Sequence, residues 1–157
     1  MSSPRGSVHA GDIAESYPVV TLGTSAREAA RLIGRDRLPG LLVAGADGRP
    51  TAILPASEVV RFMVPDYVQD DPALAGVLGE VPLERIVARL ANATVADLMP
   101  ARSVGLAVLD ADDTVVELAA TMARLRSPLC AVVDGDRIVG VVTASRLIEL
   151  ACGDDAE

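Results

Sequence analysis

The residues best suited to chemistry lie where an apolar strand pattern meets a helix pattern, in "GVVTASRLIEL" (140–150). Thr143 and Ser145 bring hydroxyls, and Arg146 brings a guanidinium, to the first turn of the predicted helix. The unpaired backbone N–H groups and the dipole at such an end favour a bound anion. A hydroxyl at the same place can instead cap the helix by accepting a backbone hydrogen bond. Thr143 therefore has two possible roles, and one side chain can serve both.

No residue set typical of an enzyme or a metal centre accompanies this helix start. His9 is the only histidine and is expected to be solvated, so no Ser-His-Asp triad can be assembled around it. The sequence also lacks a glycine-rich phosphate loop. Cys130 and Cys152 have neither metal-ligand nor disulfide-framework spacing, and we expect reduced thiols. We therefore expect a protein that is not an enzyme, needs no cofactor and binds no metal.

The charge and hydropathy of the chain exclude further classes of function. The formal net charge is −8, and residues 94–157 carry five arginines against eleven acids. Nucleic-acid binding requires a basic surface, so no nucleic-acid partner is expected. No apolar run reaches the roughly 18 residues of a membrane span. The start "MSSPRGSVHAGD" lacks the apolar core of a signal peptide, so we expect a cytoplasmic protein without membrane insertion.

The elements that must position the candidate residues occur twice in the sequence. "SAREAARLIGRDRLPGLLVA" (25–44) aligns without a gap with "TVVELAATMARLRSPLCAVV" (114–133), with six identities in twenty positions. One residue then drops out of a turn, and "RPTAILPASEVV" (49–60) aligns with "RIVGVVTASRLI" (137–148). Such self-similarity at a fixed spacing indicates two copies of one structural unit.

Each copy predicts the order strand, helix, strand, strand, helix. A capping box with the pattern Ser/Thr-x-x-Glu begins the first helix, at Ser25 in one copy and Thr114 in the other. Apolar residues at helical spacing follow each box, and Pro39 and Pro128 are predicted to stop the two helices. The turn signals "ADGRP" and "DGDR" then join two apolar strands into a hairpin.

The predicted fold class is α+β (α/β), with two tandem β-α-β-β-α repeats related by pseudo-twofold symmetry. Repeat one covers residues 10–63 and repeat two covers residues 94–151. Residues 64–93 contain two apolar helix patterns, "DPALAGVL" and "PLERIVARLA", so we expect a helical insertion rather than a flexible linker. Residues 1–9 and 152–157 are expected to fray.

The opening and closing sequences of the repeats carry a family resemblance. Repeat two opens with "TVADLMP" (94–100) and closes with "GVVT" (140–143), whereas repeat one begins with the more divergent "HAGDIAES" (9–16). This ordered set resembles the cystathionine-β-synthase (CBS) domain family. The resemblance implies a CBS pair, or Bateman module, that dimerises into a flat disk. It also implies regulation rather than catalysis, with AMP, ADP, ATP or S-adenosylmethionine bound between the repeats.

The resemblance further implies a nucleotide site at the start of each repeat's last helix. The family pattern Thr/Ser-x-x-Asp places a hydroxyl near the phosphate and a carboxylate against the ribose. Repeat two keeps Thr143 but has Arg146 at the carboxylate position, and a guanidinium can donate to phosphate but cannot accept from ribose. Repeat one has Pro55 for the hydroxyl and Glu58 for the carboxylate. The expected ligand-binding residues are Thr143, Ser145, Arg146, Arg102, Ser57, Glu58, Pro128 and Leu129.

The sequence is compatible with two functions. The first is a regulatory module that binds an adenosine nucleotide as an effector and signals to an unidentified partner protein. The second is a ligand-free structural or dimerisation module, in which Thr143 only caps its helix and Pro55 only begins one. In both cases we expect a homodimer, because the apolar helix faces exceed what one small sheet can cover.

Overall fold

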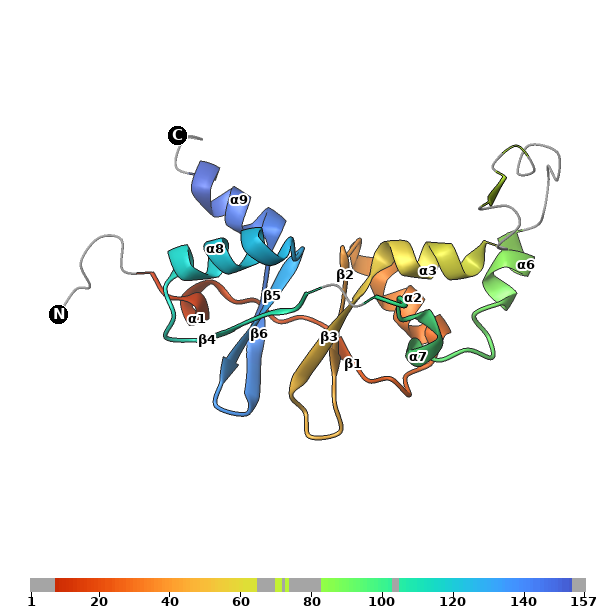
Figure 1. Ribbon diagram of the computed structural model, residues 1–157, viewed down its shortest axis with the longest axis horizontal. Coiled ribbons are helices and arrows are strands. Elements are labelled where there is room, and N and C mark those ends of the chain that lie inside the picture. The colour runs from red at the N-terminus through yellow and green to blue at the C-terminus, as the bar shows by residue number, and fades with distance from the viewer. Residues whose placement is uncertain (1–7, 65–69, 72, 74–82, 103–104, 154–157) are drawn as a thin grey trace.

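The computed structural model describes residues 8–64, 70–71, 73, 83–102 and 105–153. It contains two three-stranded sheets of the same topology, one from each repeat (Figure 1). Each sheet is accompanied by the two helices that its repeat predicts. The predicted fold class is therefore confirmed. None of the described helices is long and apolar enough to cross a membrane.

Repeat one builds the first sheet from β1 (Val19–Val20), β2 (Gly40–Ala44) and β3 (Pro50–Pro55). β1 pairs in parallel with β2, and β2 pairs antiparallel with β3. The connection between the parallel strands is α2 (Ala26–Asp36), as a parallel pair requires a crossover, and α3 (Ala56–Met63) follows β3.

Repeat two forms the equivalent elements in the same order. The strands are β4 (Ala107–Asp110), β5 (Leu129–Asp134) and β6 (Arg137–Thr143), with β4 parallel and β6 antiparallel to the central β5. The helices are α8 (Val115–Leu125) between β4 and β5, and α9 (Ala144–Cys152) after β6. The exposed thiol of Cys152 therefore ends α9, whereas Cys130 is buried in β5.

Ser25 and Thr114 cap α2 and α8 as predicted, but only α8 has the complete capping box. Ser25 Oγ accepts from the backbone N–H of Glu28 at 3.4 Å, and Thr114 Oγ1 accepts from that of Glu117 at 3.1 Å. Glu117 also reaches back, because its Oε1 accepts from the Thr114 N–H at 3.2 Å. These contacts satisfy N–H groups that have no partner inside the helix.

The two helices end before the prolines that were predicted to stop them. Each ends at an arginine in the left-handed region, Arg37 and Arg126, both with φ of 53°. The following N–H then donates back over five residues, from Leu38 to the Ile33 carbonyl at 3.0 Å in repeat one. This is the usual arrangement of a helix C-terminus with a left-handed residue, where glycine is more common. The identity of Arg37 and Arg126 in the aligned repeats thus marks a shared backbone conformation.

The two hairpins lie side by side and are linked at their turns (Figure 1). Gly48 and Gly135 take φ of 83° and 63°, which the turn signals required. The guanidinium of Arg49 in the first turn pairs with the carboxylate of Asp136 in the second. Both side chains are exposed, so we expect this pair to stabilise the fold only slightly.

The opening helix of each repeat packs against the other repeat. α1 (Ala10–Ile13) packs against β4, β5 and β6, and its Ala10 N–H donates to the carbonyl of Asp113 at 2.7 Å. α7 (Val95–Leu98) packs against α2 and α3, and its Val95 N–H donates to the carbonyl of Thr24 at 2.8 Å. The repeats along the sequence are therefore not the packing units of the fold.

The chain between α1 and β1 crosses from one half of the molecule to the other. We call residues 14–18 the crossing segment. Its Glu15 exchanges two backbone hydrogen bonds with Val141 of β6, both of 2.9 Å. Next to this contact, a Cβ on Gly140 would lie 2.7 Å from the Glu15 carbonyl oxygen. Gly140 therefore allows the crossing segment to approach β6 this closely.

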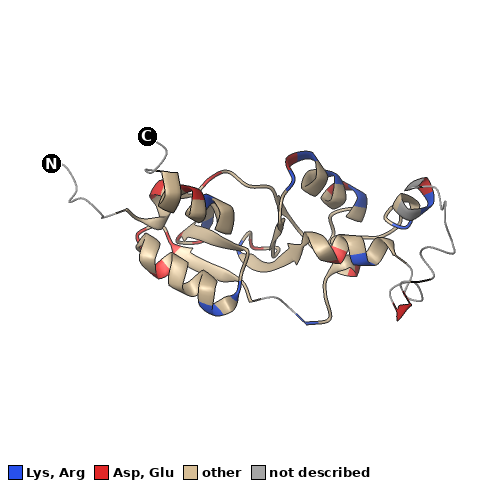
Figure 2. Ribbon diagram, turned by 90° about the horizontal axis from the view of Figure 1, so that it is seen from above, with Lys and Arg blue, Asp and Glu red and all other residues tan. Residues whose placement is uncertain are grey.

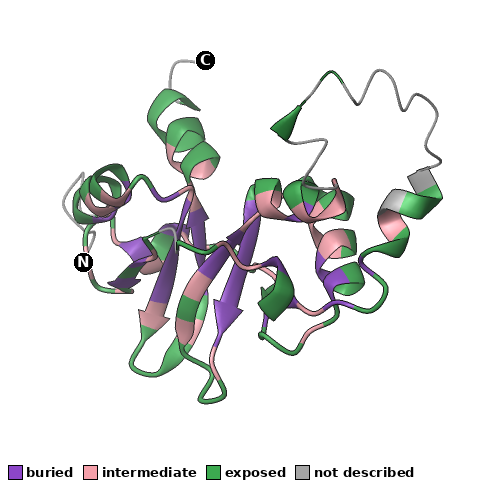
Figure 3. Cartoon of the chain, turned by 45° about the vertical axis from the view of Figure 1, so that its right-hand side comes forward, coloured by how far each residue is buried: buried purple, intermediate pink, exposed green. Residues whose placement is uncertain are grey.

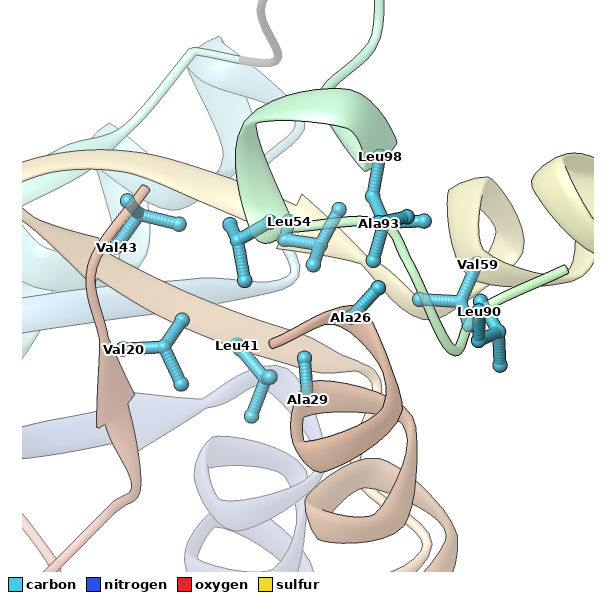
Figure 4. Packing of buried hydrophobic residues seen from close by; sticks show 11 residues of the cluster. Val20, Ala26, Ala29, Leu41, Val43, Leu54, Val59, Leu90, Ala93 and Leu98 are labelled. Atoms are coloured by element: carbon cyan, nitrogen blue, oxygen red, sulfur yellow. The ribbon is translucent and has the colours of Figure 1, made fainter. Parts of the chain in front are cut away.

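The buried side chains form two outer clusters and one central cluster. β2 is buried on both faces, with Leu41 and Val43 in the first outer cluster and Leu42 in the central cluster. A strand that is buried on both faces has a continuous apolar sequence rather than an alternating one. This burial explains why "GLLVA" has no polar residue. Leu98 of α7 lies beside Leu54 and Ala93 in the first outer cluster (Figure 4). Figure 3 shows the strands buried at the centre and the helices more exposed outside.

The helical insertion supplies α6 (Leu83–Ala88), which lies within the predicted "PLERIVARLA" helix. Leu90 after α6 is buried in the first outer cluster, and the Arg89 guanidinium lies 5.7 Å from the centre of the Phe62 ring. The described part of the insertion thus packs on the helices of repeat one. The other predicted helix, "DPALAGVL", falls almost wholly outside the described residues.

The chain ends differ in part from the fraying we expected. Val8 and His9 contact repeat two, since the Val8 carbonyl accepts from the Val115 N–H at 3.1 Å. His9 caps α1, with its backbone N–H donating to Asp12 Oδ2 at 3.0 Å, and its side chain is half exposed. Residues 1–7 and 154–157 lie outside the described residues.

Candidate ligand-binding site

The strand β6 passes directly into α9 at Thr143. Thr143 is in extended conformation, and its Oγ1 accepts from the backbone N–H of Arg146 at 3.2 Å. Ser145 Oγ lies 3.2 Å from the same oxygen. The Thr143 hydroxyl is therefore a helix cap, whichever ligand reaches this end.

A small open cavity of about 170 Å³ lies at this helix start. It brings together three of the residues predicted from the sequence, Thr143, Ser145 and Arg146. Glu149 from the next turn of α9 and Glu15 from the crossing segment complete the lining. The role of Glu15 was missed by sequence reasoning, because no local pattern places residue 15 beside residue 146. We call this cavity the α9 pocket.

Arg146 is held between two carboxylates in the α9 pocket. Its Nη1 donates to Glu149 Oε1 at 2.9 Å, and its Nε lies 3.7 Å from Glu15 Oε1. The Nε is buried and forms no hydrogen bond within the described part of the chain. Because this Nε has almost no solvent-accessible surface, an anion in the pocket would reach it only after the Arg146 side chain moved. Such an anion would also meet the negative charge of the two carboxylates.

A second, larger cavity of about 340 Å³ lies at the equivalent place in repeat one. Glu58 in the first turn of α3 lines it, together with residues of α7 and of the chain that follows. Its charged and aromatic lining residues are Glu58, Arg61, Phe62, Arg89 and Asp97. Arg89 comes from the insertion, and neither it nor Phe62 was singled out from the sequence. We call this cavity the α3 pocket.

The remaining predicted residues line neither pocket. Ser57 is exposed on α3, and Arg102 is exposed just beyond the α3 pocket. Leu129 is fully buried in the central cluster and pairs with Thr143 across β5 and β6, with Pro128 directly before it. The Leu129 carbonyl already accepts from Ser127 Oγ at 2.5 Å. The eight predicted residues thus belong to two separate pockets and their surroundings.

Tyr17 ties the crossing segment to repeat one. Its hydroxyl donates to the carbonyl of Gly40 at 2.6 Å, and its ring packs on the central cluster. Burial raises the pKa of Tyr17 from 10.0 to about 12. No sequence pattern pointed to this contact.

The raised pKa of Tyr17 predicts a loss of stability in alkali. Because the folded-state pKa lies above the unfolded one, the contribution of Tyr17 is complete below pH 10 and is lost as the pH rises to about 12. Tyr17→Phe removes this contribution. We expect urea unfolding of Tyr17→Phe to show a shallower fall of the unfolding free energy over this window than the parent. The buried thiol of Cys130, whose pKa burial also raises to about 12, is present in both proteins and cancels. Equal slopes would contradict the assignment.

Among the described residues, no group of three or more His, Cys, Asp or Glu side chains is arranged to hold a metal ion. In the α9 pocket the charged residues are an arginine paired with two acids, and the α3 pocket is lined by two arginines and two acids. The site chemistry is therefore that of hydroxyls, guanidinium groups and a helix N-terminus.

Comparison with known proteins matches repeat two to a family model and nearly the whole chain to a solved structure. The family model of the CBS domain matches residues 95–153. A crystal structure of a CBS domain-containing protein of unknown function from Kribbella flavida is 51% identical, with a TM-score of 0.85. The match covers 92% of this chain and 98% of that one. No curated protein matches the chain.

Two more distant structures share the fold. A putative acetoin utilization protein from Vibrio cholerae is 14% identical, with a TM-score of 0.64, over 96% of this chain and 98% of that one. CBSX2, a CBS-pair protein from Arabidopsis thaliana solved in complex with AMP, is 16% identical. That match has a TM-score of 0.63 and covers 94% of this chain and 98% of CBSX2.

Proposed function

This chain belongs to the CBS domain family, and we propose that it is a regulatory module that binds an adenosine nucleotide between its repeats. The candidate ligands are AMP, ADP, ATP and S-adenosylmethionine, and CBSX2, which shares the fold, binds AMP. We further propose that the bound state is signalled to a partner protein in the cytoplasm. No catalytic role is proposed, because the family's regulatory modules act by binding.

The observation that carries this proposal is the composition of the α9 pocket. The hydroxyl residues Thr143 and Ser145, the guanidinium residue Arg146 and the start of the nine-residue helix α9 line one cavity. Glu15 and Glu149 complete its lining. The hydroxyls, the guanidinium and the helix start suit a phosphate. At about 170 Å³ the cavity is smaller than the 300–1,000 Å³ usual for small-molecule sites, so we assign only the phosphates to it. The sugar and base would lie outside it, along the crossing segment.

Arg146 sets the expected selectivity of the site. A guanidinium can donate hydrogen bonds to phosphate oxygens but cannot accept them from the ribose hydroxyls. The affinity of the site should therefore rise from adenosine through AMP to ADP or ATP. It should fall with added salt, because the contact is partly exposed. Restoring the family pattern with Arg146→Asp would set a third carboxylate beside Glu15 and Glu149. We therefore expect that variant to lose phosphate binding through like-charge repulsion.

A thermal-shift screen with the four candidate ligands tests the proposal directly. A ligand that binds only the native state raises the unfolding midpoint. The alternative is a ligand-free structural module, and two contacts favour it: Thr143 already caps α9, and Arg146 is already paired with Glu149. A midpoint unchanged by all four ligands at millimolar concentration would support that alternative.

Thr143→Val is expected to weaken nucleotide binding by about 10- to 100-fold. The loss corresponds to one charge-assisted hydrogen bond of about 1.5–3 kcal/mol. Isothermal titration calorimetry measures it. Thr114→Val is the matched control, because Thr114 caps α8 in the same way but does not line the α9 pocket. Both variants should lose about 0.5–2 kcal/mol of stability through the missing cap. Unchanged affinity in Thr143→Val would restrict its hydroxyl to capping.

We also propose that the protein is a homodimer. Large apolar side chains are exposed on α3, α8 and α9, as Val60, Val116, Ile148 and Leu150 show. Covering such side chains is favourable by about 25 cal/mol per Å² of apolar area. Light scattering at micromolar concentration should therefore give twice the chain mass of 16.2 kDa.

A further inference from the structure

The opening sequence of each repeat supplies one residue to a pocket of the other repeat. Glu15 follows α1 and lines the α9 pocket, whereas Pro100 follows α7 and lines the α3 pocket. Each lies three residues after an aspartate that caps its own helix. Asp12 Oδ2 and Asp97 Oδ2 accept from the backbone N–H three residues earlier, at 3.0 and 2.9 Å. The fold therefore accommodates an uncharged residue at this position, and the carboxylate of Glu15 needs another explanation.

The backbone and the side chain of Glu15 have separate partners. The backbone exchanges two hydrogen bonds of 2.9 Å with Val141, which anchor the crossing segment to β6. The carboxylate Oε1 lies 3.7 Å from the Nε of Arg146, a distance that allows an ion pair but exceeds that of a hydrogen bond. The Glu15 side chain is 59% exposed. It can therefore leave Arg146 for water while its backbone stays in place.

The second carboxylate of the α9 pocket is attached more firmly to Arg146. Glu149 lies one turn further along α9, and its Oε1 accepts from Arg146 Nη1 at 2.9 Å. Figure 2 shows acidic residues close to basic ones on this helix, which leads to the C-terminus. Side chains three residues apart on a helix are neighbours, so this pair holds together when the guanidinium turns. An arriving anion would displace the weaker contact, which is that of Glu15.

We infer that Glu15 competes with the anionic ligand for Arg146, so that their contact holds the α9 pocket in a closed state. This inference rests on the proposed nucleotide site and specifies how that site is regulated. The Nε of Arg146 is covered in the closed state, and a phosphate reaches the guanidinium only when it turns away from Glu15. Because only the open fraction of the protein binds, the closed state lowers the apparent affinity.

The competition depends on the charge of the ligand. A phosphate in a cavity of about 170 Å³ lies well within the Debye length of about 8 Å from the Glu15 carboxylate, so salt screens their repulsion only in part. A ligand without a phosphate neither attracts Arg146 nor repels Glu15. Removing the charge of Glu15 should therefore change the affinity for ADP and leave that for adenosine as it was.

Calorimetry of Glu15→Gln with ADP and with adenosine tests the inference. The substitution removes the charge and keeps the shape of the side chain. We expect ADP to bind about 3- to 10-fold more tightly than to the parent, the range of a partly exposed charge contact, and the gain to shrink with added salt. Asp134→Asn is the control, because it removes an exposed charge at the hairpin end of β5, away from the α9 pocket. It should bind ADP as the parent does.

A double-mutant cycle with Arg146→Gln shows whether the two residues act together. Without the guanidinium there is nothing to compete for, so Glu15→Gln should raise the ADP affinity clearly less in this background. An equal gain in both backgrounds would reduce the effect to simple charge repulsion and overturn the competition. Glu15→Ala should reproduce the gain of Glu15→Gln, because it also removes the carboxylate and leaves the backbone hydrogen bonds to Val141.

The remaining outcomes separate this inference from the proposed function. ADP binding by the parent that is unchanged or weakened in Glu15→Gln would overturn the inference and leave the nucleotide site in place. A weakened affinity would show that Glu15 positions Arg146 for the ligand. Binding of ADP by Glu15→Gln alone would support a parent protein closed by Glu15. Binding by neither protein would overturn the inference together with the proposed function.

Discussion

Replacing Ile13 with alanine is expected to lower the unfolding free energy by about 2–5 kcal/mol, the usual cost of emptying a core position. Ile13 is only 6% exposed and packs in the outer cluster of repeat two, although its place in the sequence is at the start of repeat one. Urea denaturation followed by circular dichroism measures the change. The expected loss is large because α1 has only four residues, so its attachment depends on Ile13 and Ala10.

Val8→Ala is the matched control for Ile13→Ala. Val8 lies next to α1 but is 43% exposed, so its truncation should change the unfolding free energy by less than about 0.5 kcal/mol. If Ile13→Ala changed stability no more than Val8→Ala, α1 would not be part of repeat two's core. The exchange of opening helices would then be absent in solution.

Gly140→Ala is expected to destabilise the protein by about 1–3 kcal/mol, as overpacking does. The added methyl would lie 2.7 Å from the Glu15 carbonyl oxygen and 3.1 Å from the Cβ of Ala14. Because the nearest atom belongs to the backbone, the crossing segment must move. Both hydrogen bonds between Glu15 and Val141 are then strained or lost.

Hydrogen exchange separates this local effect from general destabilisation. The amides of Glu15 and Val141 should exchange faster in Gly140→Ala, while amides in the first sheet should change less. Gly23→Ala is the control, because an added Cβ there meets no atom within 4 Å. Parent-like exchange at both amides would contradict the assigned role of Gly140. Displacement of Glu15 should also alter the α9 pocket, so nucleotide binding is worth measuring on the same variant.

Much of the fold was predictable because its signals are local in the chain. The helix caps at Ser25 and Thr114, the hairpin turns and the apolar run of β2 each depend on neighbouring residues. The capping role of Thr143 belongs to the same class, since its partner is only three residues away. The predicted ends of α2 and α8 were less accurate. Both helices end at an arginine in the left-handed conformation, Arg37 or Arg126, where the sequence has no glycine to indicate it.

The sequence by itself thus determined the repeats, the order of their elements and the helix start that carries Thr143, Ser145 and Arg146. Tertiary structure alone decided which repeat each opening helix packs against. The apolar residues of α1 indicate only that a face is buried, and either sheet could bury it. The crossing that results brings Glu15 to Arg146 and Tyr17 to Gly40. These contacts join residues 131 and 23 positions apart, and no periodicity or motif links positions that far along the chain.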